Sequence, residues 1–208
     1  MARIIQTISA SGTSTAGITL AEALTLIRQN TGYEYIKTVS LTTSEVAAIE
    51  ITGLDSSIYS SFRIVSSRLG YGGSTSQNTC TIRVLTGTNT TDSGANYEMQ
   101  GIKFSSVTGF AQGSLTGWST NFGWGGPPAV ADFWLDYNIS PGASTDANIW
   151  FQTTDSKQGG YWPASGIMTG IHTSTGSTPT GIRLEASQNF RAILDTAYIT
   201  VLGLRIKS

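Results

Sequence analysis

From residue 33 onward, apolar residues recur at every second position in short runs, and clusters of Gly, Ser, Thr, Asn and Asp separate these runs. This period places apolar side chains on one face of an extended strand, and the separating clusters are typical of turns. About ten strands without intervening helices predict an all-β fold, an antiparallel jelly-roll-like β-sandwich. The runs cover residues 34–41, 45–52, 60–68, 79–86, 97–104, 131–139, 148–154, 167–172, 181–185 and 197–206.

The N-terminal region has a different pattern. A short strand-like piece and a Ser/Gly/Thr linker precede residues 19–30, whose apolar positions have helical spacing. Thr19 and Glu22 have the spacing of a capping box, which predicts that a helix begins there. We therefore expect an N-terminal arm with one short helix at 1–32 and a β-sandwich domain at 33–208. Either the helix packs on its own sandwich, or the arm anchors the protein to a neighbour through Arg3, Ile4, Ile5, Leu20, Leu24 and Ile27.

Charged residues are few and spread along the chain. The 12 Lys and Arg residues occur singly, and the formal net charge is −1. Nucleic-acid binding needs a clustered basic surface, which this distribution does not provide. The first residues lack the apolar core of a signal peptide, and no apolar run has the length of a membrane span. We therefore expect a soluble protein made in the cytoplasm, with no nucleic-acid partner and no membrane insertion.

Side chains that perform catalysis are scarce. The chain has one histidine, His172, and one cysteine, Cys80. No G-x-S-x-G motif accompanies His172, so nucleophilic catalysis is not indicated. One His and one Cys exclude the usual zinc sites, and a calcium ion held by loop Asp residues is an open alternative. We expect no enzymatic activity, no cofactor, and a buried structural Cys80 beside Ile82 and Val84.

The closest pair of carboxylates is Asp132 and Asp136, in the sequence ADFWLDYN. In a strand they share a face but lie about 13 Å apart, because each residue advances the chain by about 3.3 Å. Glycoside hydrolysis uses carboxyl groups separated by about 5 to 10 Å. A hydrolase would therefore need a partner from another strand, such as Glu98 or Asp155.

The same run offers a binding surface. Apolar residues at odd positions from 133 to 139 predict a core face, and the even positions combine Trp134 with acids and an amide. This mixture can stack on a sugar ring and hydrogen-bond to its hydroxyls. In the alternative, a loop or a neighbouring subunit covers Trp134. The candidate glycan or partner contacts are Trp118, Phe122, Trp124, Asp132, Trp134, Asp136, Trp150, Tyr161 and Trp162.

Residues 108–128 form the longest segment without clear alternation, and they contain four of the aromatic residues of the chain among several glycines. Long loops in compact domains are usually functional or disordered. Aromatic residues favour the functional case, because a disordered loop gains nothing from them. We therefore predict a loop that presents aromatic side chains.

Two segments resemble a known family. One is GLDSSIYSSFRIV at residues 53–65, and the other comprises GIRLEASQNF and AYITVLGLRI within residues 181–206. They resemble β-sandwich virion structural proteins of tailed bacteriophages, in which a Gly-Leu-Asp turn leads into a strand and a final strand closes around an aromatic-Gly pair. The chain departs from that pattern at Phe62, where tyrosine is more typical, and at Leu202, where an aromatic residue usually precedes the glycine.

The residues of the segment at 53–65 also have a physical explanation as a turn followed by a strand. Asp55 is expected to cap the backbone donors of the turn. Tyr59, Phe62 and Ile64 are the candidate packing residues of the strand that follows. The resemblance does not cover residues 105–180, where the aromatic-rich segment lies.

The resemblance implies a role on the particle surface as a capsid decoration protein, a tail or head fibre, or a fibre adaptor. Such proteins are commonly homotrimers, and their partners are other virion proteins. The protein would be made in the host cytoplasm and released by lysis. We therefore expect a non-enzymatic virion structural protein that acts through protein–protein assembly. The alternative is a carbohydrate-binding module or receptor-binding tip that recognises a host surface polysaccharide.

Overall fold

The computed structural model contains no helix in the segments that it describes. The predicted anchor residues of the arm, Arg3, Ile4, Ile5, Leu20, Leu24 and Ile27, lie outside these segments. The described residues are 32–71, 78–103, 108–124, 132–139, 147–154, 166–173 and 178–206.

All ten predicted strands are present, and their ends agree within one residue except in the strand near residue 181. That strand begins at Pro179, where a missing N–H group is tolerated, and it continues to Ala192. The ten strands are β1 (Tyr33–Leu41), β2 (Val46–Thr52), β3 (Tyr59–Ser67), β5 (Asn78–Thr86), β7 (Tyr97–Lys103), β10 (Asp132–Ile139), β11 (Ala147–Thr154), β12 (Gly166–His172), β13 (Pro179–Ala192) and β14 (Ala197–Arg205).

Four further strands were not predicted: β4 (Leu69–Tyr71), β6 (Thr90–Thr91), β8 (Thr108–Leu115) and β9 (Trp118–Trp124). The last two show that the predicted loop at 108–128 is wrong as far as residue 124. β8 pairs with β7, whereas β9 pairs with β5. Alternation is lost here because the register shifts between Tyr97 and Met99, and because Ser114 has a φ of 56°.

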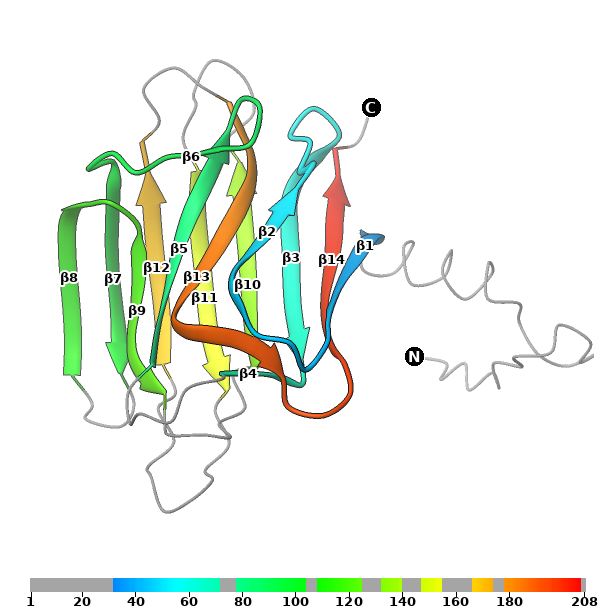
Figure 1. The fold of residues 1–208 in the computed structure, drawn as a ribbon. Helices are drawn as coiled ribbons and strands as arrows, with labels where there is room; N and C mark the ends of the chain where they lie inside the picture. The colour runs from blue at the N-terminus through cyan, green and yellow to red at the C-terminus, as the bar shows by residue number, and fades with distance from the viewer. Residues whose placement is uncertain are drawn as a thin grey trace, which may run out of the picture.

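The strands form two antiparallel sheets that pack as a sandwich (Figure 1). The large sheet has eight strands in the order β1-β14-β3-β10-β11-β12-β7-β8. The small sheet follows the path β2-β13-β5-β6, with β4 and β9 paired to β13 and β5. The turn between β8 and β9 therefore joins the two layers. The predicted β-sandwich is confirmed, and its jelly-roll connectivity stays a prediction.

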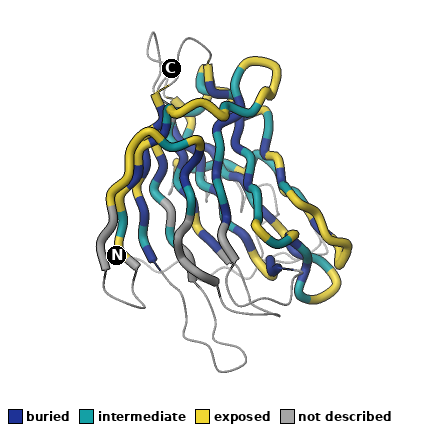
Figure 2. Tube along the Cα trace, turned by 60° about the vertical axis from the view of Figure 1, so that its left-hand side comes forward, coloured by how far each residue is buried: buried dark blue, intermediate teal, exposed yellow. Residues whose placement is uncertain are grey.

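The core lies between the two sheets. Buried and exposed positions alternate along many strands, as the colours of Figure 2 show. Burial of one large apolar side chain contributes about 1.5–3 kcal/mol, so the period-two pattern of the sequence is what two packed sheets require. The largest fully buried side chains include Trp118, Tyr71, Tyr97, Tyr137 and Phe62.

The two segments that carry the family resemblance are neighbours in the fold. β3 pairs with β14 and places Phe62 opposite Gly203. Tyr59 packs directly over Gly203, where an added Cβ would lie 2.4 Å from Tyr59 Cδ1. Asp55 caps the turn as predicted, because its Oδ1 accepts a hydrogen bond from the Ser57 backbone N–H at 2.8 Å. The Ser57 hydroxyl and backbone N–H together lower the pKa of Asp55.

Candidate binding surface

Strand β10 has the core face and the outer face that the sequence predicts. Phe133, Leu135 and Tyr137 are buried, whereas Trp134 and Asp136 lie on the outer face of the large sheet. Nine large apolar side chains are exposed among the described residues. Five of them lie on this outer face, namely Tyr35, Ile102, Trp134, Ile171 and Tyr198. This face therefore carries most of the exposed apolar groups in the described part of the chain.

Strand register aligns one row of side chains across the outer face. Neighbouring strands are about 4.8 Å apart, so the row spans about 24 Å from β3 to β8. It brings together Asp136 and Trp150, two of the predicted contacts, with Trp134 two residues before Asp136 on β10. We call it the cross-strand row, and it consists, in order, of Arg63, Asp136, Trp150, Thr169, Gln100 and Ala111.

A compact cluster around Arg63 stands at one end of the cross-strand row. The Arg63 guanidinium donates to both oxygens of Asp136, with Nε–Oδ1 at 2.8 Å and Nη2–Oδ2 at 3.2 Å. It also stacks on the Trp134 and Tyr33 rings, 4.4 Å and 4.6 Å from their centroids. The hydrogen bond to Asp136 raises the pKa of Arg63. A partly exposed ion pair contributes about 1 kcal/mol or less, so its main effect is to fix these side chains in place.

Trp134 remains accessible within this cluster. Its indole Nε1 donates to Asp136 Oδ1 at 3.1 Å, and 40% of the residue is still exposed. A neighbouring pair of amides adds to the polar groups, because Asn138 Nδ2 donates to Asn148 Oδ1 at 3.0 Å. The cluster thus presents a fixed indole ring beside planar polar groups.

A hollow of about 450 Å³ lies at the other end of the row. It exists because Ala111 and Gly113 on β8 carry little or no side chain and because the β7–β8 register shifts beside them. Polar and apolar groups line it about equally, and most of the lining residues are exposed. Its walls include Glu98, Gln100, Gln112, Thr169 and Ile171.

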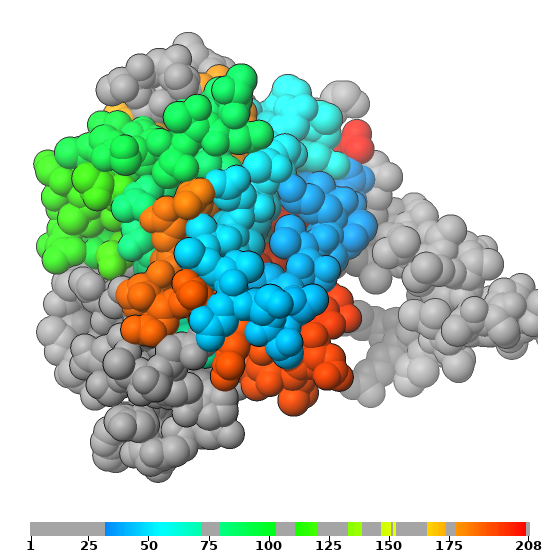
Figure 3. Space-filling model, viewed as in Figure 1, coloured from blue at the N-terminus to red at the C-terminus, as the bar shows by residue number. Residues whose placement is uncertain are grey.

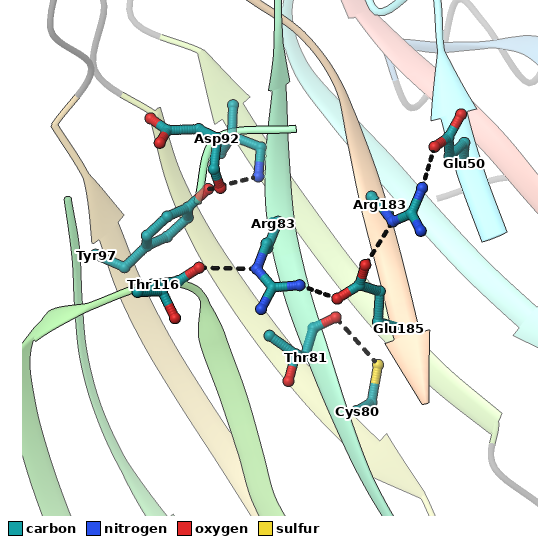
Figure 4. Close-up of polar contacts among 10 residues, drawn as sticks. Glu50, Cys80, Thr81, Arg83, Asp92, Tyr97, Thr116, Arg183 and Glu185 are labelled. Carbon is teal, nitrogen blue, oxygen red and sulfur yellow. Dashed lines mark hydrogen bonds and ion pairs between the residues drawn. The ribbon is translucent and has the colours of Figure 1, made fainter. Parts of the chain in front are cut away.

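The outer face of the small sheet is different, because its charges are paired with one another (Figure 4). Arg183 binds both Glu50 and Glu185, and Arg83 binds Glu185 and the carbonyl oxygen of Thr116. Figure 3 shows this side of the molecule, where β2, β13 and β5 make a continuous surface. The charged groups on the outer face of the small sheet are thus paired with one another. The hollow, by contrast, is lined by polar side chains such as Gln100 and Thr169 that can bind a ligand.

His172 is part of the core of the sandwich. The residue is fully buried, and its Nε2 lies 2.8 Å from Asp92 Oδ2. Burial alone would raise the pKa of Asp92, but hydrogen bonds from the Gly94 backbone N–H, His172 and Asn96 together lower it. The Tyr97 ring packs 4.6 Å from the His172 ring. The arrangement cross-links the β6–β7 loop to β12.

Cys80 is also buried, on the same inward face of β5 as Ile82 and Val84. Burial raises the pKa of its thiol. The predicted structural role of Cys80 is confirmed.

The prediction that Trp118 contacts a ligand or partner is wrong, because this side chain is fully buried. Gly170 leaves space for the indole against β12. The indole Nε1 donates to the carbonyl oxygens of Glu98 at 3.0 Å and Ile171 at 3.3 Å. Trp118 therefore fastens β9 of the small sheet to β7 and β12 of the large sheet.

The remaining predicted contacts are not tested by the structure. Phe122, Trp124 and Asp132 belong to β9 and β10, but their side chains are not among those described. Tyr161 and Trp162 lie outside the described residues. Trp134, Asp136 and Trp150 are thus the predicted contacts that the structure brings together.

Sequence reasoning missed the partners of these residues. Arg63, Thr169 and Gln100 each occupy an outward position of an alternating strand, which is a signal for exposure. That signal does not say which strands are neighbours. Arg63 and Asp136 are 73 residues apart in the sequence, and only the pairing of β3 with β10 joins them.

The structure also bears on the carboxylate pair that hydrolysis would need. Glu98 lies on β7, which is three strands away from β10 in the sheet. That separation is about 14 Å at the usual spacing of strands, so Glu98 does not supply the partner for Asp136. Asp155 lies outside the described residues.

Within the described residues, no group of three or more His, Cys, Asp or Glu side chains is placed to hold a metal ion. The same part of the chain has no helix with the length and hydropathy of a membrane span. Comparison of the chain with family models, with curated proteins and with solved structures finds no match. The likeness to virion proteins therefore depends on the two sequence segments alone.

Proposed function

We propose that this chain is a non-enzymatic structural protein on the surface of a tailed bacteriophage particle and that it acts through protein–protein assembly. The observation that carries the proposal is the exposed aromatic edge of the large sheet. β1 is the last strand of that sheet, and Tyr35 and Tyr198 on its outer face are 56% and 44% exposed. We call this surface the edge patch, which comprises Tyr35, Tyr198, Leu202 and Leu204.

An edge strand has backbone N–H and C=O groups that can pair with another chain. Exposed apolar side chains beside that edge add area that association would remove from water. In our proposal, the edge patch packs against another copy of the chain in a homotrimer. β1 begins directly after residues 1–32, so an anchoring arm and this packing surface would adjoin along the chain.

The family resemblance supports the same proposal. Its two segments include the paired strands β3 and β14, of which β14 carries Tyr198, and residues 181–190 lie in β13 of the small sheet. A capsid decoration protein, a fibre or a fibre adaptor each fits a sandwich with one edge used for assembly. The protein would be made in the host cytoplasm, would join other virion proteins and would be released by lysis.

The test is to tag the gene in the phage genome and to purify the particles by density gradient. We expect the tagged chain in the particles. A variant that lacks residues 1–32 should give the circular dichroism spectrum of a folded protein but should be absent from the purified particles. Absence of the full-length chain from purified particles would refute the proposal.

The edge patch is tested separately by sedimentation of the purified chain. We expect a trimer that Tyr35→Ser with Tyr198→Ser dissociates. Leu194→Ser is the matched control, because Leu194 is 58% exposed but lies off the patch. A monomer in the wild type, or a trimer that both variants leave intact, would contradict a role for this edge.

A further inference from the structure

We propose that the cross-strand row and the adjoining hollow bind a neutral oligosaccharide, which lies across the strands from Trp134 to the hollow beside β8. This site does not depend on particle assembly. It adjoins the edge patch at Arg63, which lies opposite Leu202, and extends from there toward the opposite edge of the same sheet. The juxtaposition that motivates it is a pair of indole rings beside a polar hollow.

The first element of the site is its aromatic platform. Trp134 is held by the Arg63 stack at 4.4 Å and by its hydrogen bond to Asp136, and it remains 40% exposed. Trp150 lies directly opposite Asp136 on β11 and is half-buried. A ring whose orientation is already fixed, as that of Trp134 is, loses little conformational entropy on binding. The apolar face of a sugar ring can therefore stack on it at low entropic cost.

The second element is a set of unused hydrogen-bonding groups. Within the described residues, the side chains of Gln100 and Thr169 make no hydrogen bond to another side chain or to the backbone, although both residues line the hollow. Amide and hydroxyl groups both donate and accept. Sugar hydroxyls do the same, so the hollow is complementary to them.

The third element is the balance of charge. Arg63 is neutralised by both oxygens of Asp136, which leaves Glu98 as the charged side chain that lines the hollow. A carboxylate repels an acidic polysaccharide but can accept hydrogen bonds from neutral hydroxyls. The site is therefore suited to a neutral chain.

The spacing of the carboxylates argues for binding without cleavage. Glu98 and Asp136 lie on strands separated by about 14 Å, which exceeds the separations of about 5 to 10 Å used in glycoside hydrolysis. The row itself, at about 24 Å, is long enough for several sugar units. Recognition of an extended polysaccharide is the chemistry that this geometry supports.

The experiment begins with the full chain on an array of neutral and acidic bacterial surface polysaccharides. We expect binding to at least one neutral polysaccharide, which is then titrated while tryptophan fluorescence is recorded. Trp134→Ala and Trp150→Ala should each weaken binding at least tenfold. Gln100→Ala, at an exposed position where folding is little affected, should weaken it about threefold or more.

Two controls separate this site from the edge patch. Tyr35→Ser with Tyr198→Ser should leave saccharide binding unchanged while it dissociates the trimer, and Trp134→Ala should leave the trimer intact. Failure of one proposal is therefore distinguishable from failure of the other.

Four results would overturn the inference. Three concern binding itself, namely no binding on the array, binding confined to acidic polysaccharides, and binding that the Trp134, Trp150 and Gln100 variants leave unchanged. A Trp134→Ala variant that dissociates the trimer would show that a second copy of the chain covers this face, which also overturns it.

Discussion

The packing of Trp118 against Gly170 predicts a large and specific effect of one methyl group. In Gly170→Ala, the new Cβ would lie 2.3 Å from Trp118 Nε1 and 2.5 Å from its Cδ1. Both distances are far below van der Waals contact. The indole cannot move away freely, because its N–H donates to two backbone carbonyls and its ring packs edge-on against Tyr97, with centroids 5.0 Å apart.

The expected cost follows from two contributions. Overpacking of a core costs about 1–3 kcal/mol. A displaced indole would also weaken its hydrogen bonds, and each is worth about 1 kcal/mol net. We therefore expect Gly170→Ala to lower the free energy of unfolding by about 2–4 kcal/mol, which corresponds to a fall in Tm of roughly 4–16 °C for a domain of this size.

A double-mutant cycle tests whether this contact is the cause. Trp118→Ala alone should cost about 3–5 kcal/mol, as large-to-small core substitutions do. In that background, the methyl group that Gly170→Ala adds would enter space that the indole vacated. The second substitution should then cost about 0.5 kcal/mol or less, so the two effects are far from additive.

The assay is urea unfolding, monitored by circular dichroism, of the wild type, the two single variants and the double variant. Gly113→Ala is the matched control on β8, because a Cβ there would meet Glu98 Cγ at an ordinary 3.8 Å. It should change stability by less than about 0.5 kcal/mol. Equal costs of Gly170→Ala in the presence and absence of the Trp118 indole would refute the reasoning.

Three further outcomes are expected. The lowered pKa of Asp92 means that its stabilising contribution is complete well above about pH 4 and is lost as the pH falls through the folded-state value. Asp92→Asn should therefore flatten the acid side of the stability–pH curve measured by urea unfolding, and an unchanged curve would contradict this contribution. Gly203→Ala should destabilise the fold by about 1–3 kcal/mol in urea unfolding, since its Cβ would lie 2.4 Å from Tyr59 Cδ1; an unchanged midpoint would contradict this packing. The buried thiol of Cys80, whose pKa is raised, should resist a thiol reagent at pH 8 until urea unfolds the chain, and rapid labelling of the native protein would show that it is accessible.

The strands themselves could be predicted because each one is a local pattern. Alternation placed Leu135 in the core and Trp134 on the surface, and the structure agrees. The same reasoning failed for residues 108–124. Glycines and a register shift hide the alternation there, and β9 pairs with β5, which is not its neighbour in the sequence. Trp118 was misplaced for the same reason, because its burial depends on the space beside Gly170.

The sequence alone determined the fold class, the positions of ten strands and the face that each alternating residue occupies. These properties depend on the steric and hydrophobic preferences of short segments. The tertiary structure decided which outward residues meet. Strand order joined Arg63 to Asp136 and Trp150 to Thr169, and it left Glu98 too far from Asp136 for a catalytic pair. Because pairing between distant strands depends on the packing of the whole sandwich, no local pattern contains it.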